Sequence, residues 1–108
     1  MADIYNSNNR LVGFYYEGRG DVYDSNYNLV GYAYAGTGEV YDANCDYVGR
    51  VCLRNIYGEV YDAYNNYVGI AYGGVEGKTY DSQGYLVATI WGCEDPIVGG
   101  AAYLLLLR

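Results

Sequence analysis

Residues 95–108 read DPIVGGAAYLLLLR, and this C-terminal segment decides how the rest of the chain must be arranged. Asp95 can accept the first free amide hydrogens of a helix, and Pro96 suits the first helical position, where its missing N–H is no loss. The alanine and leucine residues that follow favour continuation of the helix. The segment therefore predicts a helix over residues 95–107.

The predicted helix has no polar face. Residues 97–107 are apolar on every side, which in a soluble chain is typical of a helix surrounded by protein. The stretch is also too short to span a bilayer. We therefore expect the preceding residues to enclose it, with Gly99 and Gly100 thinning the helix where it passes a crowded wall.

The preceding residues are five copies of one hairpin. The copies share a Tyr at Tyr5, Tyr23, Tyr41, Tyr61 and Tyr80, and the spacings between these positions are 18, 18, 20 and 19 residues. After each Tyr, at a fixed distance, come an apolar pair and a Gly or Ala. Such a unit accommodates two strands and two turns. We predict a single domain over 1–108, with repeats at about 4–21, 22–39, 40–59, 60–78 and 79–93.

The first turn of each repeat has its own chemistry. In the last copy, Asp81 can bond back to the backbone and Gly84 accepts a positive φ, so residues 81–84 predict a type I turn followed by a bulge. The position of Gly84 is taken in the other copies by Asn9, Tyr27, Cys45 and Asn65. Because Tyr27 and Cys45 adopt a positive φ only at a cost, we expect those two turns to differ in detail.

The fold class follows from the repeat. About ten antiparallel strands in up-and-down order have two exposed edges, and pairing the first strand with the last removes both. We therefore predict an all-β protein, a small closed barrel with the apolar helix inside. The expected inward face carries Leu29, Gly31, Ala33, Tyr67, Gly69 and Ala71, and the outward face carries Val30, Tyr32, Tyr34, Val68, Ile70 and Tyr72. An open repeat sheet, with the tail against one side or against a neighbouring subunit, is the alternative.

This organisation resembles the tubby-like and scramblase-like superfamily, closed antiparallel barrels with an apolar C-terminal helix through the centre. The resemblance is carried by the Tyr-Asp-x-x-Gly-x-x-Val pattern over residues 80–87 and by the tail over 97–107. It implies the barrel fold. The basic phosphoinositide-binding residues of tubby domains have no counterpart in a chain with one Lys, so lipid binding does not carry over. The repeat also looks like the Tyr/Gly hairpins of bacterial cell-wall-binding modules, although Trp91 is the only Trp.

Composition excludes several classes of partner. The chain has 108 residues and a net charge of −7, which opposes binding to nucleic acid or to an anionic membrane. Residues 1–6 lack the basic and apolar regions of a secretory signal, so we expect a cytoplasmic protein. The odd number of cysteines, Cys45, Cys52 and Cys93, predicts free thiols in reducing surroundings.

The sequence argues against catalysis. With no His, the usual Ser or Cys nucleophile has no base to activate it. The carboxylates of Asp24, Asp42, Asp62 and Asp81 recur at one position, as turn caps do, whereas an acid/base pair needs two unlike environments. Residues 24–28 and 42–46 match the opening of a calcium loop but lack its later Gly and Glu. We expect no enzyme, no cofactor and no metal site.

Tyrosine is the unusual surface candidate, since the chain has 17 of them. We expect a Tyr-rich outer wall, with Tyr23, Tyr41, Tyr61, Tyr80, Tyr32, Tyr34 and Tyr72 as candidate binding residues and Tyr15, Tyr16, Tyr47, Tyr57, Tyr64 and Tyr67 adding to it. Tyr is enriched in binding surfaces, although cross-strand ring pairs also simply stabilise a sheet. The hypothesis is a non-catalytic structural or interaction module that binds protein, including copies of itself. The alternatives are a carbohydrate-binding module that stacks glycan on Tyr and a small acidic inhibitor that mimics a polyanion.

Overall fold

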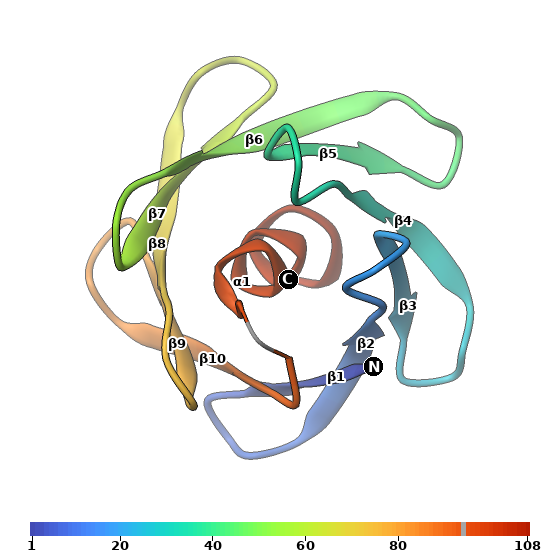
Figure 1. Ribbon diagram of the computed structural model, residues 1–108, viewed down its shortest axis with the longest axis horizontal. Coiled ribbons are helices and arrows are strands. Elements are labelled where there is room, and N and C mark those ends of the chain that lie inside the picture. The colour runs from blue at the N-terminus through green and yellow to red at the C-terminus, as the bar shows by residue number, and fades with distance from the viewer. Residues whose placement is uncertain (94) are drawn as a thin grey trace.

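The computed structural model describes residues 1–93 and 95–108 and shows a closed antiparallel barrel around a C-terminal helix (Figure 1). The strands are β1 (Ala2–Asn6), β2 (Leu11–Tyr15), β3 (Asp21–Asp24), β4 (Leu29–Ala33), β5 (Glu39–Asp42), β6 (Tyr47–Leu53), β7 (Tyr57–Asp62), β8 (Tyr67–Tyr72), β9 (Gly77–Asp81) and β10 (Leu86–Trp91). They are followed by α1 (Ile97–Ala102) and the π-helical η1 (Tyr103–Leu107). The predicted fold class is confirmed.

The barrel closes because the first strand pairs with the last. Ile4 of β1 lies opposite Ile90 of β10 on one side and opposite Gly13 of β2 on the other. Each of the ten described strands therefore has two hydrogen-bonded neighbours, and none of them leaves an edge to pair with another chain. The open sheet considered above is wrong.

Five turns of one geometry form one end of the barrel, which we call the turn end; they span residues 6–10, 24–28, 42–46, 62–66 and 81–85. In each turn the side-chain oxygen of the first residue accepts amide hydrogens from the residues two and four positions later, at 2.9–3.0 Å. The fourth residue has a positive φ, 65° at Tyr27 and 67° at Cys45. The expectation that these two turns differ is wrong, because the capping bonds hold all five in one conformation. Gly84 has the largest φ of the five, 88°, and glycine adopts this angle without steric cost.

A bulge in each hairpin shifts the expected alternation of side chains. The register skips Val30 between β3 and β4 and Val68 between β7 and β8, so each valine is an extra residue on its strand. Both valines turn partly inward and pack against the core, whereas Leu29 is 37% and Tyr67 is 42% exposed. The prediction that Leu29 and Tyr67 face inward is therefore wrong, while Gly31, Ala33, Gly69 and Ala71 are buried as predicted.

The interior is built in layers, to which each repeat contributes one residue. The layer from the first strands consists of Ile4, Val22, Val40, Val60 and Thr79, all fully buried. The layer from the second strands consists of Tyr15, Ala33, Val51, Ala71 and Ile90. Tyr15 was expected on the outer wall; instead it is fully buried and its hydroxyl donates a hydrogen bond to the carbonyl of Ala33 at 3.2 Å. It takes the inward position after Gly13, where the pleat of β2 directs every second side chain inside.

The helix enters from the opposite end, which we call the loop end, where loops 16–20, 34–38, 54–56 and 73–76 join successive hairpins. The Asp95 side chain accepts the amide hydrogen of Ile97 at 3.1 Å, as predicted. Pro96 is the N-cap residue, so the prediction that it takes the first helical position is wrong by one residue. The α-helix begins at Ile97 and changes to a π-helix at Tyr103, so the predicted single helix over 95–107 differs in its start and its last turn.

Small residues let the helix approach the wall at the loop end. A methyl group added to Gly99 would lie 2.9 Å from Ile90 Cγ2, and one added to Gly100 would lie 2.6 Å from Ala71 Cβ. Contacts this short cannot be accommodated without displacing the wall. The thinning role predicted for the two glycines is therefore confirmed.

Large residues fill the turn end in the opposite manner, with one leucine for each of four repeats. A methyl group added to Gly13, Gly31, Gly49 or Gly69 would lie 2.7–2.8 Å from a δ-carbon of Leu107, Leu106, Leu105 or Leu104, respectively. Each residue of an α-helix is rotated by about 100° about the helix axis relative to the one before it. Five repeats arranged around a ring are separated by a smaller angle. In a π-helix the turn is wider and the rotation per residue is smaller, which brings it closer to the spacing of the repeats. The change to a π-helix therefore allows successive leucines to meet successive repeats.

None of the helices in the described part of the chain combines the length and the apolar character that crossing a membrane requires.

Candidate functional site

The tyrosines of the first strands lie on the outside of the barrel. Tyr23, Tyr41, Tyr61 and Tyr80 follow buried residues of β3, β5, β7 and β9, and alternation along the strand turns them outward. All four are half-buried, because neighbouring rings cover them. Ring centroids lie 5.4 Å apart for Tyr16 and Tyr23, 5.8 Å for Tyr61 and Tyr67, and 5.8 Å for Tyr72 and Tyr80. Much of this wall is thus engaged in cross-strand packing.

The largest group of rings consists of Tyr32 in β4, Tyr34 directly after it, Tyr41 in β5 and Tyr47 in β6. Tyr32 and Tyr34 stack in parallel with their centroids 6.1 Å apart, Tyr34 contacts Tyr41 at 5.9 Å, and Tyr41 contacts Tyr47 at 5.8 Å. Of the predicted binding residues, the structure brings these three together: Tyr32, Tyr34 and Tyr41. Of the others, Tyr23 pairs with Tyr16, Tyr61 pairs with Tyr67, and Tyr72 contacts both Tyr80 and Tyr57.

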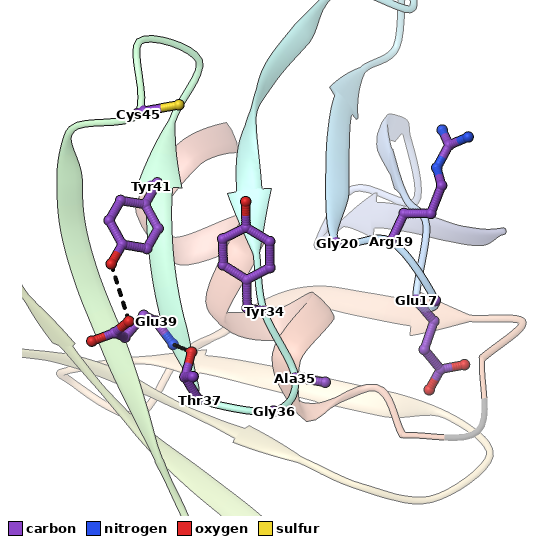
Figure 2. A pocket seen from close by; sticks show the side chains of 11 residues that line it. Glu17, Arg19, Gly20, Tyr34, Ala35, Gly36, Thr37, Glu39, Tyr41 and Cys45 are labelled. Carbon is purple, nitrogen blue, oxygen red and sulfur yellow. Dashed lines mark hydrogen bonds between the residues drawn. The ribbon is translucent and has the colours of Figure 1, made fainter.

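A groove of about 600 Å³ opens on the outer surface beside these rings, and Figure 2 shows it from close by. It is lined by residues 17–20, residues 34–37, Glu39, Tyr41 and Cys45. The two loops meet here because hydrogen bonding between their strands continues into them: the Ala33 amide donates to the Gly20 carbonyl at 2.8 Å. Gly20 has a φ of 88° and no side chain, and a methyl group there would lie 3.1 Å from the Tyr34 ring.

One wall of the groove carries a phenol bonded to a carboxylate. The Tyr41 hydroxyl donates to Glu39 Oε1 at 3.0 Å, and the Glu39 amide donates to the Thr37 hydroxyl at 3.2 Å (Figure 2). The bond to Glu39, together with burial, raises the pKa of Tyr41 because both favour the neutral phenol. Tyr41 therefore stays protonated at neutral pH and acts as a donor to the carboxylate.

The other wall carries charges that are already engaged. The Arg19 guanidinium lies 2.7 Å from Asp21, and the Glu17 carboxylate accepts the amide hydrogen of Asp95 at 3.0 Å. These contacts fix loop 16–20 against the start of the C-terminal segment. Glu39 forms no ion pair within the described residues.

Sequence reasoning identified the groove tyrosines but missed Glu17, Thr37, Glu39 and Cys45. A signal for Glu39 was present, since an acidic residue stands two positions before the repeat Tyr in four copies, at Asp3, Asp21, Glu39 and Glu59. Two residues along a strand lie on the same face, so this spacing places a carboxylate beside each ring. The fifth copy has Lys78 at that position.

The repeated carboxylates at the turn end serve the backbone. Two backbone amides donate to each of Asp24, Asp62 and Asp81, and these bonds lower the pKa of all three because they favour the charged form. Asp42, at the start of the segment that resembles a calcium loop, likewise accepts amide hydrogens from Asn44 and Asp46. Among the described residues, no group of three or more His, Cys, Asp or Glu side chains could hold a metal ion. Cys45, Cys52 and Cys93 are free, as predicted.

The resemblance to tubby-like and scramblase-like barrels stays a prediction. No protein-family model, no curated protein and no solved structure matches this chain.

Proposed function

We propose that this protein is a non-catalytic interaction module that binds a partner protein through the groove formed by loops 16–20 and 34–38 and by β5. The observation that carries the proposal is the groove itself: about 600 Å³ bounded by the rings of Tyr34 and Tyr41, with the Glu39 carboxylate on the wall that carries Tyr41. Tyr34 is 40% exposed although it contacts Tyr32 and Tyr41. Rings held in this way give contact area at little cost in conformational entropy.

Charge favours a basic partner over a second copy of this chain. Two copies, each with a net charge of −7, repel one another as they approach, whereas a basic surface is attracted. The closed barrel also leaves no strand edge for end-to-end addition of subunits. The self-assembly variant of the hypothesis is therefore the weaker one.

The absence of catalysis is part of the same proposal. The chain has no His, and the repeated carboxylates at the turn end are occupied by backbone amides. A cytoplasmic location belongs to the proposal too, and the three free thiols support it.

A carbohydrate ligand is the second candidate, because Tyr32 and Tyr34 stack with an interplanar angle of 1° and present parallel rings of the kind that pack on sugar faces. Glycan-array binding that is lost in Tyr41→Ala and Tyr61→Ala variants would support it, and no binding to any glycan would exclude it. The acidic-inhibitor alternative needs carboxylates clustered on one side, whereas those at Asp24, Asp42, Asp62 and Asp81 are distributed over four turns.

The test of the leading proposal is selection of peptides from a random displayed library on the immobilised barrel. We expect selected peptides to bind at the groove and to bind Tyr34→Ala at least tenfold more weakly. Tyr72 provides the matched control: it occupies the same repeat position, is 38% exposed and contacts Tyr80 as Tyr34 contacts Tyr41, but it does not line the groove. Equal loss in Tyr72→Ala, or selected peptides that bind elsewhere, would contradict the proposal.

A further inference from the structure

Two adjacent repeats carry the same arrangement of two tyrosine rings and one carboxylate. In one repeat an arginine of the chain itself lies in this arrangement, and in the other no arginine does. Residues 16–23 read YEGRGDVY and residues 34–41 read YAGTGEVY. The two segments match at every position except 17, 19 and 21, which correspond to 35, 37 and 39. We call Tyr16, Asp21 and Tyr23 the filled cradle, and Tyr34, Glu39 and Tyr41 the open cradle.

The filled cradle holds a guanidinium. The Arg19 Cζ atom lies 5.0 Å from the centre of the Tyr16 ring, and its Nη2 lies 2.7 Å from Asp21 Oδ2. The Tyr23 ring meets Tyr16 edge-on at 5.4 Å, and its hydroxyl donates to the same Asp21 oxygen at 3.3 Å. The ring face and the carboxylate thus act together on one cation.

The open cradle has the same three groups in the same relation. Tyr34 and Tyr41 lie 5.9 Å apart at an interplanar angle of 58°, close to the 68° of Tyr16 and Tyr23. The Tyr41 hydroxyl donates to Glu39 at 3.0 Å, as Tyr23 does to Asp21. The position of Arg19 is taken by Thr37, whose side chain is too short to reach over the ring. Tyr34, Glu39 and Tyr41 all line the groove (Figure 2).

The neighbouring cation of this chain serves another ring. Arg50 lies opposite Glu39 in the register of β5 and β6, but its Cζ lies 4.7 Å from the centre of the Tyr61 ring. Within the described residues, no ion pair forms between Arg50 and Glu39. In the described part of the chain, the Tyr41 hydroxyl is thus the side chain that contacts the Glu39 carboxylate.

We infer that the open cradle binds an arginine side chain of the partner protein, with the guanidinium over the Tyr34 ring and paired with Glu39. This inference rests on the proposed function and specifies its ligand. Arginine suits the site better than lysine, because its planar guanidinium can stack on an aromatic face and pair with a carboxylate at once. The partner surface is accordingly basic, which the net charge of −7 favours.

The direct test is an NMR titration of the full chain with N-acetyl-arginine amide, followed through the backbone amides of residues 34–41. N-acetyl-citrulline amide, which has nearly the same shape without the charge, is the control ligand. We expect millimolar binding of the arginine compound and at least tenfold weaker binding of the citrulline compound, since a bond between two charged groups is lost. Equal binding of the two, or shifts confined to other repeats, would overturn the inference.

A sharper test exchanges the residues that distinguish the two cradles, Arg19 and Thr37. Thr37→Arg should fill the open cradle from within and abolish binding of the arginine compound, whereas Val75→Arg, which adds the same charge at an exposed residue outside the groove, should leave its Kd within about twofold. Arg19→Thr should empty the filled cradle and raise the stoichiometry from one site to two. Glu39→Gln should weaken binding about tenfold or more. Unchanged binding in Thr37→Arg would contradict the inference, provided that the variant keeps the wild-type amide spectrum outside residues 34–41.

These outcomes separate the inference from the proposed function. Displayed peptides that occupy the groove without an arginine would end the inference and leave the interaction module standing. Binding of the arginine compound with no peptide selected at the groove would retain the cradle and count against the interaction module.

Discussion

The two ends of the barrel hold the same helix in opposite ways. At the turn end the wall is reduced to glycine, and Leu104 to Leu107 fill the space; at the loop end the helix is reduced to Gly99 and Gly100, and Ile90 and Ala71 approach it. The four repeats that each meet one leucine are alike in this glycine, and all five repeats are alike in their turn; the fifth repeat has Ala88 in place of the glycine. Where the helix is thin, the repeats differ in inward side chain and in loop length. The repeats are therefore nearly alike at the turn end, where four of them pack against a leucine. They differ at the loop end, where the packing allows different side chains and loops, and the groove is formed there.

The largest effect is expected from enlarging the helix at the loop end. In Gly100→Val the added atoms would overlap Ala71 and Thr79, and we expect a loss of about 3 kcal/mol or more in the free energy of unfolding. Gly36→Val is the control, because a methyl group at Gly36 meets no atom within 4 Å. Chemical denaturation of both variants measures the difference. A Gly100→Val variant as stable as Gly36→Val would show that the helix does not pass the wall closely.

Emptying the turn end is expected to cost slightly less. Leu105→Ala should lower the free energy of unfolding by about 2–4 kcal/mol, because the side chain that fills the space over Gly49 is removed. Leu29→Ala is the matched control, since Leu29 is 37% exposed on the outer wall. Similar losses in the two variants, measured by urea denaturation, would argue against one leucine per repeat.

The layer between the two ends contains one mismatch. Thr79 is fully buried, its hydroxyl has no hydrogen-bond partner within the described residues, and the other four repeats have Ile or Val in its place. A buried hydroxyl without a partner is destabilising, so we expect Thr79→Val to raise the free energy of unfolding by about 1 kcal/mol. Thr79→Ser, which keeps the hydroxyl and loses the methyl group, should be less stable than wild type. Destabilisation by Thr79→Val in thermal melts would reveal an unseen partner of the hydroxyl.

The turn end can be tested through its positive φ angles. Cys45→Gly should stabilise the protein by up to about 1 kcal/mol, because glycine adopts the φ of 67° without steric cost. Tyr27 has nearly the same φ, but its ring stacks on Phe14 with centroids 4.6 Å apart. Tyr27→Gly should therefore gain nothing or lose stability, since stacking contributes about 0.5–1.5 kcal/mol. Equal gains in the two variants would mean that the Phe14 contact contributes little.

The smallest effects are expected from pH, which acts on the two ends separately. The folded pKa of Asp24, Asp62 and Asp81 lies below the unfolded value, so their contribution is present above about pH 4 and is lost as the pH falls through the folded pKa. Burial raises the pKa of Cys93, beside the loop end, from 9.0 to about 11. The contribution of Cys93 to the free energy of unfolding is therefore present below pH 9 and is lost as the pH rises through the folded pKa. Melting temperatures recorded across pH should fall at both extremes. Asp81→Asn should flatten only the acid limb and Cys93→Ala only the alkaline limb.

Much of the candidate site was predictable from single residues and their spacing. Alternation along a strand places Tyr34 and Tyr41 outside once the buried valines are recognised, and both were predicted. Glu39 was missed, although its position two residues before Tyr41 indicates a shared face. Cys45 and Glu17 could not be predicted, because they reach the groove through the pairing of neighbouring hairpins. Tyr15 was wrongly placed outside for a related reason: its inward direction depends on the register set by the bulge at Val12.

The sequence by itself determined the five hairpins and the buried helix and favoured a closed barrel over an open sheet, because a repeat with two edges and a helix without a polar face each have few stable arrangements. The pairing of β1 with β10 that closes the barrel was decided by the tertiary structure. The tertiary structure alone decided which residue of each bulge turns inward, that the helix ends as a π-helix matched to successive repeats, and that one of two like cradles stays open. These outcomes depend on contacts between segments far apart in the chain. The local sequence pattern does not predict them, because the conformation of each hairpin depends on its contacts with the neighbouring hairpins and with the helix.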